Sequence, residues 1–202
     1  NFDLGVGADF IRAEDTYKFD LSSRFVKLDW YQYQLNVSLG VQWQRIWNKQ
    51  TQTTVFAQHN RIRFRRGADQ GNDGNLNLIG ASVVRALDDS GKTLVSASGF
   101  LGVDAERNTR LDGSREVFGA RLASQIGIRN DLGVFGSAGV QWSLYDRTNG
   151  IFGIRRRDLQ MDASIGMLWR PATNWSVRPQ LDLVRNLTDI PTNAYERLKL
   201  GL

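Results

Sequence analysis

Few residues in this 202-residue chain have the types and spacing that catalysis requires. The only histidine is His59, and the adjacent Asn60 is not the acidic or hydroxyl partner that a general base needs for proton transfer or nucleophilic attack. The sequence contains no cysteine and no second histidine, so the usual nitrogen and thiolate ligands of a metal site are missing. We therefore predict that the chain is not an enzyme and carries no cofactor or metal ion.

The acidic residues are also better explained by structure than by chemistry. Asp88 and Asp89 open the segment DDSGK, which has the composition of a tight turn. Asp158 and Asp162 alternate with apolar residues, as expected for the polar face of a strand. The glycine-rich segment GADQGNDGN (67–75) lacks the ligand spacing of a calcium loop, so we expect a solvated loop there.

Positive charge is in mild excess. The chain has 26 Lys and Arg against 21 Asp and Glu, a net charge of +5 and a pI of about 9.8. Two runs concentrate this charge, RIRFRR (61–66) and RRR (155–157). In a soluble protein such runs suggest nucleic-acid binding, whereas at the rim of a membrane barrel the same arginines would pair with lipid phosphates. The choice therefore depends on the fold.

The elements that must position these residues are strands, and the clearest of them lie between Leu132 and Leu187. Apolar and polar residues alternate there almost without interruption in three consecutive segments. The apolar positions are Leu132, Val134, Gly136, Ala138, Val140, Trp142 and Leu144, then Leu159, Met161, Ala163, Ile165, Met167 and Trp169, then Trp175, Val177, Pro179, Leu181, Leu183 and Leu187. A period of two places successive side chains on opposite faces of a sheet, here one apolar and one polar.

The length of these segments distinguishes among β folds. They are far longer than the roughly five or six residues of a typical strand in a soluble domain. With one apolar and one polar face, they predict an all-β fold, an antiparallel up-and-down transmembrane β-barrel. The mean hydropathy of −0.38 does not contradict this, because only alternate residues of such strands face lipid. A soluble sandwich or a lipocalin-like barrel, with its apolar face pointing inward, is the alternative.

The sequence divides into about ten such strands joined by connections of alternating length. We predict strands over 1–12, 30–47, 53–65, 76–87, 93–105, 115–129, 132–145, 158–170, 175–187 and 197–202. Residues 13–29 are mixed and charged, and we interpret them as a long loop. Short turns near 49, 90, 130 and 172 alternate with long polar loops near 70, 110, 151 and 191, as in outer-membrane barrels, whose short turns are periplasmic. Ten strands would place both termini on the periplasmic side.

The six tryptophans agree with this arrangement. Trp43, Trp47, Trp169 and Trp175 lie beside predicted short turns, and Trp30 and Trp142 lie near the opposite strand ends. An indole ring is favoured where apolar and polar environments meet. We predict that these six residues form girdles at the two membrane interfaces; in a soluble sandwich they would cap strand ends instead.

The polar face would line the lumen of such a barrel. Its predicted lining residues carry charges or amides: Arg121, Arg129, Arg170, Arg178, Asp162, Asp182, Gln141, Gln160 and Gln180. A water-filled lumen tolerates these groups, whereas a dry core would leave them costly and unpaired. The alternative is that they pair across strands and plug a narrow barrel.

In a barrel the two arginine runs fall at the outer rim of the strands. We expect them to contact outer-membrane lipid there, pairing with the anionic phosphates of lipopolysaccharide. We accordingly predict no nucleic-acid partner.

Residues 155–202 carry three short motifs near the end of the chain. Arg156 and Asp158 form R-x-D, Arg178, Pro179 and Leu181 form R-P-x-L, and Tyr195 and Arg197 form Y-x-R before the final strand. This pattern resembles the C-terminal part of outer-membrane barrels fused to periplasmic tetratricopeptide repeats. It is most similar to the surface lipoprotein assembly modifier (Slam) family, and related repeat-linked exporters of polysaccharide share much of it.

The resemblance implies a channel in the bacterial outer membrane for export or translocation. Its substrate would be a protein or lipoprotein, or a polysaccharide, delivered by a periplasmic repeat domain or partner. Barrels of this family have more than ten strands and end on an aromatic residue, which is missing after Leu202. We therefore expect residues 1–202 to be one barrel domain whose N-terminal strands and periplasmic domain lie outside this sequence. The competing function is a plugged structural or adhesion barrel whose extracellular loops bind a partner.

Overall fold

A computed structural model describes residues 2–28, 31–65, 72–108, 110–172 and 174–201. The described chain is all-β apart from short 3₁₀ segments such as Pro191–Asn193. Its strands are β1 (Phe2–Arg12), β2 (Asp15–Leu28), β3 (Tyr31–Asn48), β4 (Thr51–Phe64), β5 (Gly74–Ala86), β6 (Thr93–Glu106), β7 (Arg115–Gly127), β8 (Leu132–Thr148), β9 (Arg155–Ala172), β10 (Trp175–Val177), β11 (Gln180–Thr188) and β12 (Tyr195–Gly201). No helix among these residues is long and apolar enough to cross a membrane.

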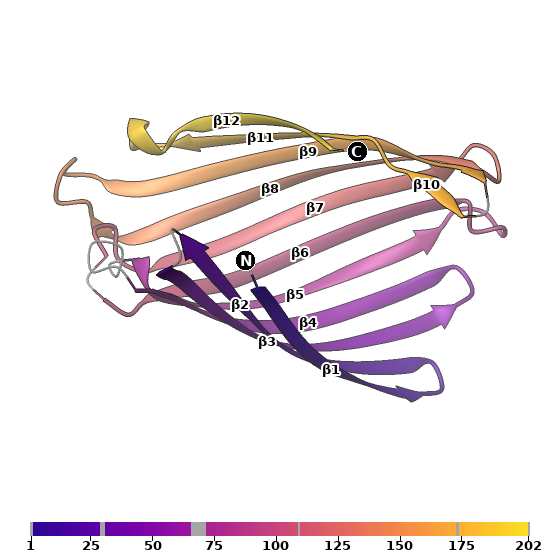
Figure 1. Cartoon of the computed structure of the whole chain (residues 1–202), viewed down its shortest axis with the longest axis horizontal. Coiled ribbons are helices and arrows are strands. Elements are labelled where there is room, and N and C mark those ends of the chain that lie inside the picture. The colour runs from indigo at the N-terminus through magenta and orange to yellow at the C-terminus, as the bar shows by residue number, and fades with distance from the viewer. Residues whose placement is uncertain (1, 29–30, 66–71, 109, 173, 202) are drawn as a thin grey trace.

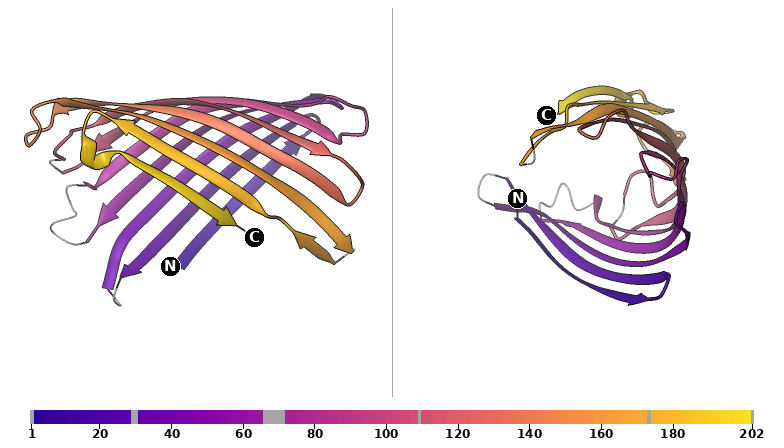
Figure 2. Two further views of the ribbon diagram at one scale, coloured as in Figure 1. Left: turned by 90° about the horizontal axis from the view of Figure 1, so that it is seen from above. Right: turned by 90° about the vertical axis from the view of Figure 1, so that its right-hand side faces the viewer.

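The strands form one antiparallel sheet in which each strand pairs with the next along the chain (Figure 1). Eleven strands follow one another from β1 to β12, and short β10 pairs with β9 off this path. Seen end-on, the sheet curls into an open C, with β1 and β12 at its two free edges (Figure 2). The fold is thus an up-and-down sheet with the curvature of a barrel, not closed within the described residues.

The connections give the sheet two distinct ends. Loops 65–73, 107–114, 149–154 and 189–194 lie at one end, which we call the long-loop end. Turns 13–14, 49–50, 87–92, 128–131 and 173–174 lie at the other, the short-turn end. The predicted alternation of short and long connections after residue 48 holds in part, because turn 87–92 is as long as loops 149–154 and 189–194.

Sequence alternation becomes a difference between the two faces of the curved sheet. Along β5, Ile79, Ala81 and Val83 are more exposed than the residues between them, because they lie on the convex face. Their register partners on β6 and β7 are also apolar, for example Leu101 opposite Ile79 and Phe118 opposite Leu101. A continuous apolar band therefore crosses the convex face, and polar side chains gather on the concave face.

Residues 15–28 correct the first prediction. They were expected to be part of a long loop over 13–29, but they form β2, a full-length strand paired with both β1 and β3. The chain reverses through a two-residue turn in which Ala13 adopts a φ of 51°. The alternation of apolar and polar residues in this segment is weak, because Ser23 occupies an apolar position, while charged Lys18 and Asp20 face the concave side.

The extra strand also changes the predicted topology. Eleven strands along the sheet, instead of ten, put the chain ends at opposite ends of the sheet. Phe2 pairs with Phe25 near the long-loop end, and Gly201 pairs with Gln180 near the short-turn end. The expectation that both termini lie on one side was therefore wrong.

The predicted strand over 175–187 is interrupted. It divides into β10 and β11 around Arg178 and Pro179, since proline has no N–H to donate to the ladder. The Pro179 carbonyl still accepts a hydrogen bond from the Met167 N–H at 3.1 Å, so the chain stays attached to β9 across the break.

The turn between β5 and β6 is ordered by one side chain. The Asp88 carboxylate accepts hydrogen bonds from the Ser90 hydroxyl and from the backbone N–H groups of Lys92 and Thr93, at 2.5, 3.0 and 2.6 Å. These donors hold the pKa of Asp88 well below its usual range, and the Ser90 hydroxyl has the largest effect. Gly91 supplies the positive φ, 67°, that the turn requires.

Candidate functional surface

The concave face brings most of the predicted lining residues together. Arg121, Asp162, Arg170 and Asp182 and the glutamines Gln141, Gln160 and Gln180 all occupy concave positions of β7, β8, β9 and β11. Arg178 reaches the same face from the break between β10 and β11. Arg129 instead lies in the turn 128–131 and pairs with Asp131 at 3.1 Å. Its predicted place in the sheet was wrong, because β7 ends at Gly127.

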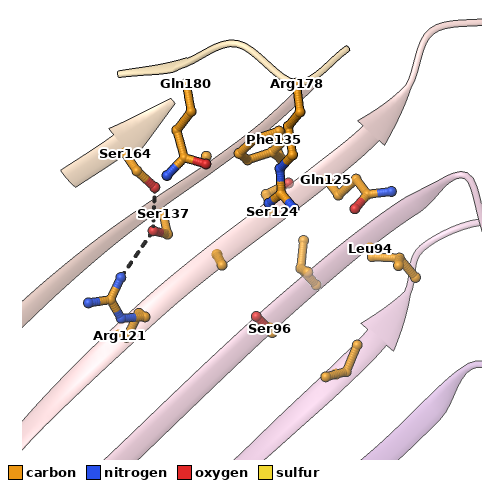
Figure 3. Close-up of a pocket in the computed structure, with 14 residues that line it drawn as sticks. Leu94, Ser96, Arg121, Ser124, Gln125, Phe135, Ser137, Ser164, Arg178 and Gln180 are labelled. Atoms are coloured by element: carbon orange, nitrogen blue, oxygen red, sulfur yellow. Dashed lines mark hydrogen bonds between the residues drawn. The ribbon is translucent and has the colours of Figure 1, made fainter. Parts of the chain in front are cut away.

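The middle of this face holds a cavity of about 370 Å³ (Figure 3). Arg121 donates to Asp162 at 2.7 Å and to the Ser137 hydroxyl at 3.2 Å, and the Ser137 and Ser164 hydroxyls are 2.8 Å apart. The Arg121 side chain remains 47% exposed, so its charge is only partly neutralised. The cavity is therefore lined by a cation, hydroxyls and amides together with apolar side chains such as Leu94 and Phe135.

A second cation borders the same cavity. The Arg178 guanidinium lies over the Phe135 ring, 4.4 Å from its centroid. The same ring lies close to Gly166 on β9, where a Cβ would collide with the ring. Below them, the Gln180 amide donates to Asp182 at 2.5 Å. Arg178 is thus held in place by stacking, with its charge facing the cavity (Figure 3).

At the long-loop end, loop 107–114 is pinned to the concave face. Arg110 in that loop donates to the Asp104 carboxylate at 3.1 Å, and Arg115 on β7 donates to the same carboxylate at 3.0 Å. Asp104 is buried, so this double pairing compensates the loss of its hydration. Arg147 on β8 reaches over to Glu106 at 2.5 Å and to the Arg110 carbonyl at 2.9 Å.

A second group of ions ties the same loop to β9. Arg156 donates two hydrogen bonds to Asp158, at 2.9 and 2.7 Å, and a third to Asp112 of the loop at 3.1 Å. Its guanidinium also lies 4.7 Å from the centroid of the Tyr145 ring. Asn149, at the start of the next long loop, donates to Asp112 at 2.5 Å. The R-x-D motif is therefore the anchor that joins two long loops to the sheet.

These two groups form one network, which we call the mouth network: Asp104, Glu106, Arg110, Asp112, Arg115, Tyr145, Arg147, Asn149, Arg156 and Asp158. Tyr145 joins the halves, since its hydroxyl is 3.3 Å from Arg115 and 3.5 Å from Asp158. A cavity of about 550 Å³ lies beside the network. The sequence prediction missed this network because its members come from distant segments.

Four tryptophans of the described chain, Trp43, Trp47, Trp169 and Trp175, lie toward the short-turn end, and Trp142 lies toward the long-loop end. Trp43 is on the convex face and donates to Asp15 at 2.9 Å, and Trp47 donates to Thr53 at 2.9 Å. Trp169 and Trp175 flank the turn 173–174, with Trp175 70% exposed. Trp142 stacks on Phe118 on the convex face, 5.4 Å between centroids. Trp30 lies outside the described residues.

The histidine and the acidic clusters show no catalytic arrangement. His59 lies on the convex side with its Nδ1 2.7 Å from the Asn77 side-chain oxygen. Asp158 and Asp162 belong to separate ion pairs, with Arg156 and Arg121. Across the part of the chain that the structure describes, no three His, Asp or Glu residues are grouped to hold a metal ion.

The two basic runs are arranged differently, because 155–157 divides between the faces and Arg61 and Arg63 share the convex face. Arg61, Arg155 and Arg157 occupy convex positions at the long-loop end, beyond the apolar band. Arg156 points the other way, into the mouth network. Alternation along β9 separates Arg156 from Arg155 and Arg157, whereas Arg61 and Arg63, two positions apart on β4, lie on the same face.

Comparison of the chain with protein-family models, curated proteins and solved structures gives no match.

Proposed function

We propose that this chain is the wall of an outer-membrane β-barrel that serves as a channel for export or translocation. The observation that carries the proposal is the contrast between the two faces of the curved sheet. The convex face exposes a band of large apolar side chains across its strands, including Leu101, Leu122 and Ile165 at 62, 66 and 65% exposure. The concave face carries the charged and amide groups.

Physical chemistry supports lipid as the environment of the convex face. Soluble monomers rarely expose contiguous apolar patches larger than a few hundred Å², because contact with water is unfavourable there. Lipid accepts the same surface at no such cost, and the strands between the two edges satisfy one another's backbone groups as a membrane requires. A water-filled concave side then hydrates Arg121, Arg178 and their neighbours.

The charge and the width of the lumen would determine which solutes pass through the channel. Arg121 on β7 and Arg178 in the break between β10 and β11 line the same concave cavity, so they would act on a solute together. The resemblance of residues 155–202 to Slam-like barrels supports a protein or lipoprotein substrate, or a polysaccharide, delivered by a periplasmic repeat domain or partner. Convex arginines such as Arg155 and Arg157 would contact lipopolysaccharide phosphates at the outer leaflet.

Single-channel recording tests this function. The full-length protein in planar bilayers should give stable conductance steps, and Arg178→Glu should shift its ion selectivity toward cations. Arg157→Glu, on the convex face, should leave selectivity unchanged. A folded, heat-modifiable protein that conducts no ions, or equal selectivity shifts in both variants, would contradict the channel.

The mouth network favours a second candidate, a plugged structural or adhesion barrel. Arg110 and Asp112 bind the loop inward by ion pairs with Asp104 and Arg156, which narrows the long-loop end. If the recordings are silent in the parent protein and steps appear only when Arg156→Ala releases this loop, the loops rather than the lumen carry the function.

A further inference from the structure

Among the described residues, the two edge strands have no pairing partner along their outer sides. β1 pairs only with β2, and β12 pairs only with β11. All eleven residues of β1 are exposed. Viewed end-on, the two edges face each other across the opening of the C (Figure 2). Closure of the sheet therefore depends on what can pair with both edges.

Strand direction decides what can close the sheet. β1 starts with Phe2 at the long-loop end and ends at the turn 13–14, so it runs toward the short-turn end. β12 follows loop 189–194 and ends at Gly201, so it runs the same way. Direct pairing of β1 with β12 would be parallel, whereas every described pair in this sheet is antiparallel.

The sequence of β1 indicates that its free edge is meant to be paired. Natural edge strands avoid unwanted pairing by being short or by carrying proline, bulges or inward-pointing charges. β1 has eleven residues, no proline and an unbroken register with β2, and its inward-pointing Asp3 and Asp9 pair with Arg24 and Lys18 of β2. Its convex side carries Phe2, Leu4, Val6 and Phe10, which continue the apolar band up to the edge.

A second copy of the chain cannot pair antiparallel with both free edges in a membrane barrel. This step rests on the proposed function. Rotation about the barrel axis keeps strand directions, so β12 of one copy would again meet β1 of the other in parallel. A two-fold axis across the barrel would make the pairing antiparallel. It would also put long loops on both sides of the membrane, which conflicts with one short-turn side and one long-loop side.

We propose that an odd number of further strands of the same polypeptide closes the sheet between β1 and β12. A single strand running from the short-turn end to the long-loop end is antiparallel to both edges. Three or five antiparallel strands would also close the sheet without a parallel pair. An even number leaves one parallel seam. The same polypeptide is the source because strand order in this sheet follows the sequence throughout. Such strands should alternate apolar and polar residues, like β1.

Site-specific photo-crosslinking in the full-length protein, in its native membrane, tests this inference. p-Benzoylphenylalanine replaces Phe10 on β1 or Leu198 on β12, and mass spectrometry identifies the adducts. A third probe at Leu101, in the middle of β6, is the matched control on the same convex face. Both edge probes should give intramolecular adducts with a segment outside residues 1–202, and the Leu101 probe should give none.

Three results would overturn the inference: an adduct between Phe10 and β12, an adduct of twice the monomer mass, or edge adducts confined to β2, β11 and lipid. Alkaline carbonate extraction of the same membranes tests the proposed function separately. Complete release of the protein by carbonate refutes the membrane barrel, while the edge adducts still decide whether a segment outside residues 1–202 fills the gap.

Discussion

Replacing Arg156 should release loop 107–114 from the sheet at a large cost in stability. The Arg156 side chain is 19% exposed, and it bridges Asp158 and Asp112, whose side chains are 8 and 11% exposed. Removing the cation leaves two nearly buried carboxylates without their main partner. Asp158 keeps only the long Tyr145 contact at 3.5 Å, and Asp112 keeps Asn149.

The magnitude follows from the hydrogen bonds that the Arg156 guanidinium makes. Three charge-assisted hydrogen bonds are broken, each contributing about 1.5–3 kcal/mol, but such contributions do not add fully. Breaking a buried ion pair from one side typically costs about 3–5 kcal/mol. We expect Arg156→Ala to lower the free energy of unfolding by about this amount. Arg156→Lys should lower the free energy of unfolding by a smaller amount, since an ammonium keeps the positive charge but cannot bridge both carboxylates bidentately.

The assay compares urea unfolding in detergent, followed by tryptophan fluorescence, with hydrogen exchange of residues 107–114. Arg129→Ala is the matched control, because Arg129 pairs with Asp131 at the exposed short-turn end and should cost about 0–1 kcal/mol. Exchange in the loop should rise in Arg156→Ala and stay unchanged in the control. Equal unfolding free energies for the two variants would refute the assignment of Arg156 as the loop anchor.

Three further changes test other parts of the structure. Leu122→Arg on the convex face should impair refolding into lipid vesicles by about 2–4 kcal/mol, whereas Ala123→Arg on the concave face should not; equal refolding yields would refute the face assignment. Gly113→Ala should destabilise more than Gly91→Ala, because both have positive φ but only a Cβ at Gly113 meets neighbouring atoms, and thermal melting measures the difference. The pKa of Asp88 is lowered in the folded protein, so Asp88 stabilises the turn at pH values above its unfolded pKa of about 4, and this stabilisation is lost as pH falls through the folded pKa. Asp88→Asn should therefore remove the acid dependence of amide exchange in the turn. An unchanged pH profile in this variant would contradict the role of Asp88.

The sequence predicted strands well wherever alternation was unbroken. β8 and β9 lie close to their predicted ranges, because apolar residues occupy every second position throughout the predicted segments. β2 was missed because one serine at a convex position and several charges at concave ones resemble a loop in sequence. Missing that one strand reversed the predicted location of the N-terminus, since topology depends on the parity of the strand count.

The concave face could be predicted as a set of residues but not as a site. Alternation alone shows that Arg121 and Asp162 share a face, and register between β7, β8 and β9 brings them to 2.7 Å. The pair of Arg156 with Asp112 spans 44 positions and depends on how a long loop folds back, which no local pattern encodes. The motif that resembles a family feature, R-x-D, turns out to hold that loop.

Glycines opposite aromatic rings are another feature that needs the register. Gly80 lies beneath Phe56 and Gly119 beneath Phe100, each glycine directly opposite its phenylalanine on the neighbouring strand. Their positions in the sequence predict turns or bulges as readily as close packing. Only the pairing of strands shows that these glycines make room for rings on the concave face.

If the chain is the wall of a membrane barrel as proposed, its convex face contacts lipid while its concave face contacts water. The chain contains no cysteine, so single cysteines at successive positions 118–125 of β7 can each carry a spin label without background. In bilayers, collision with oxygen should be high at the convex positions 118, 120, 122 and 124, and collision with a water-soluble nickel chelate should be high at 119, 121, 123 and 125. Accessibility without a period of two, or with the two phases exchanged, would contradict the account.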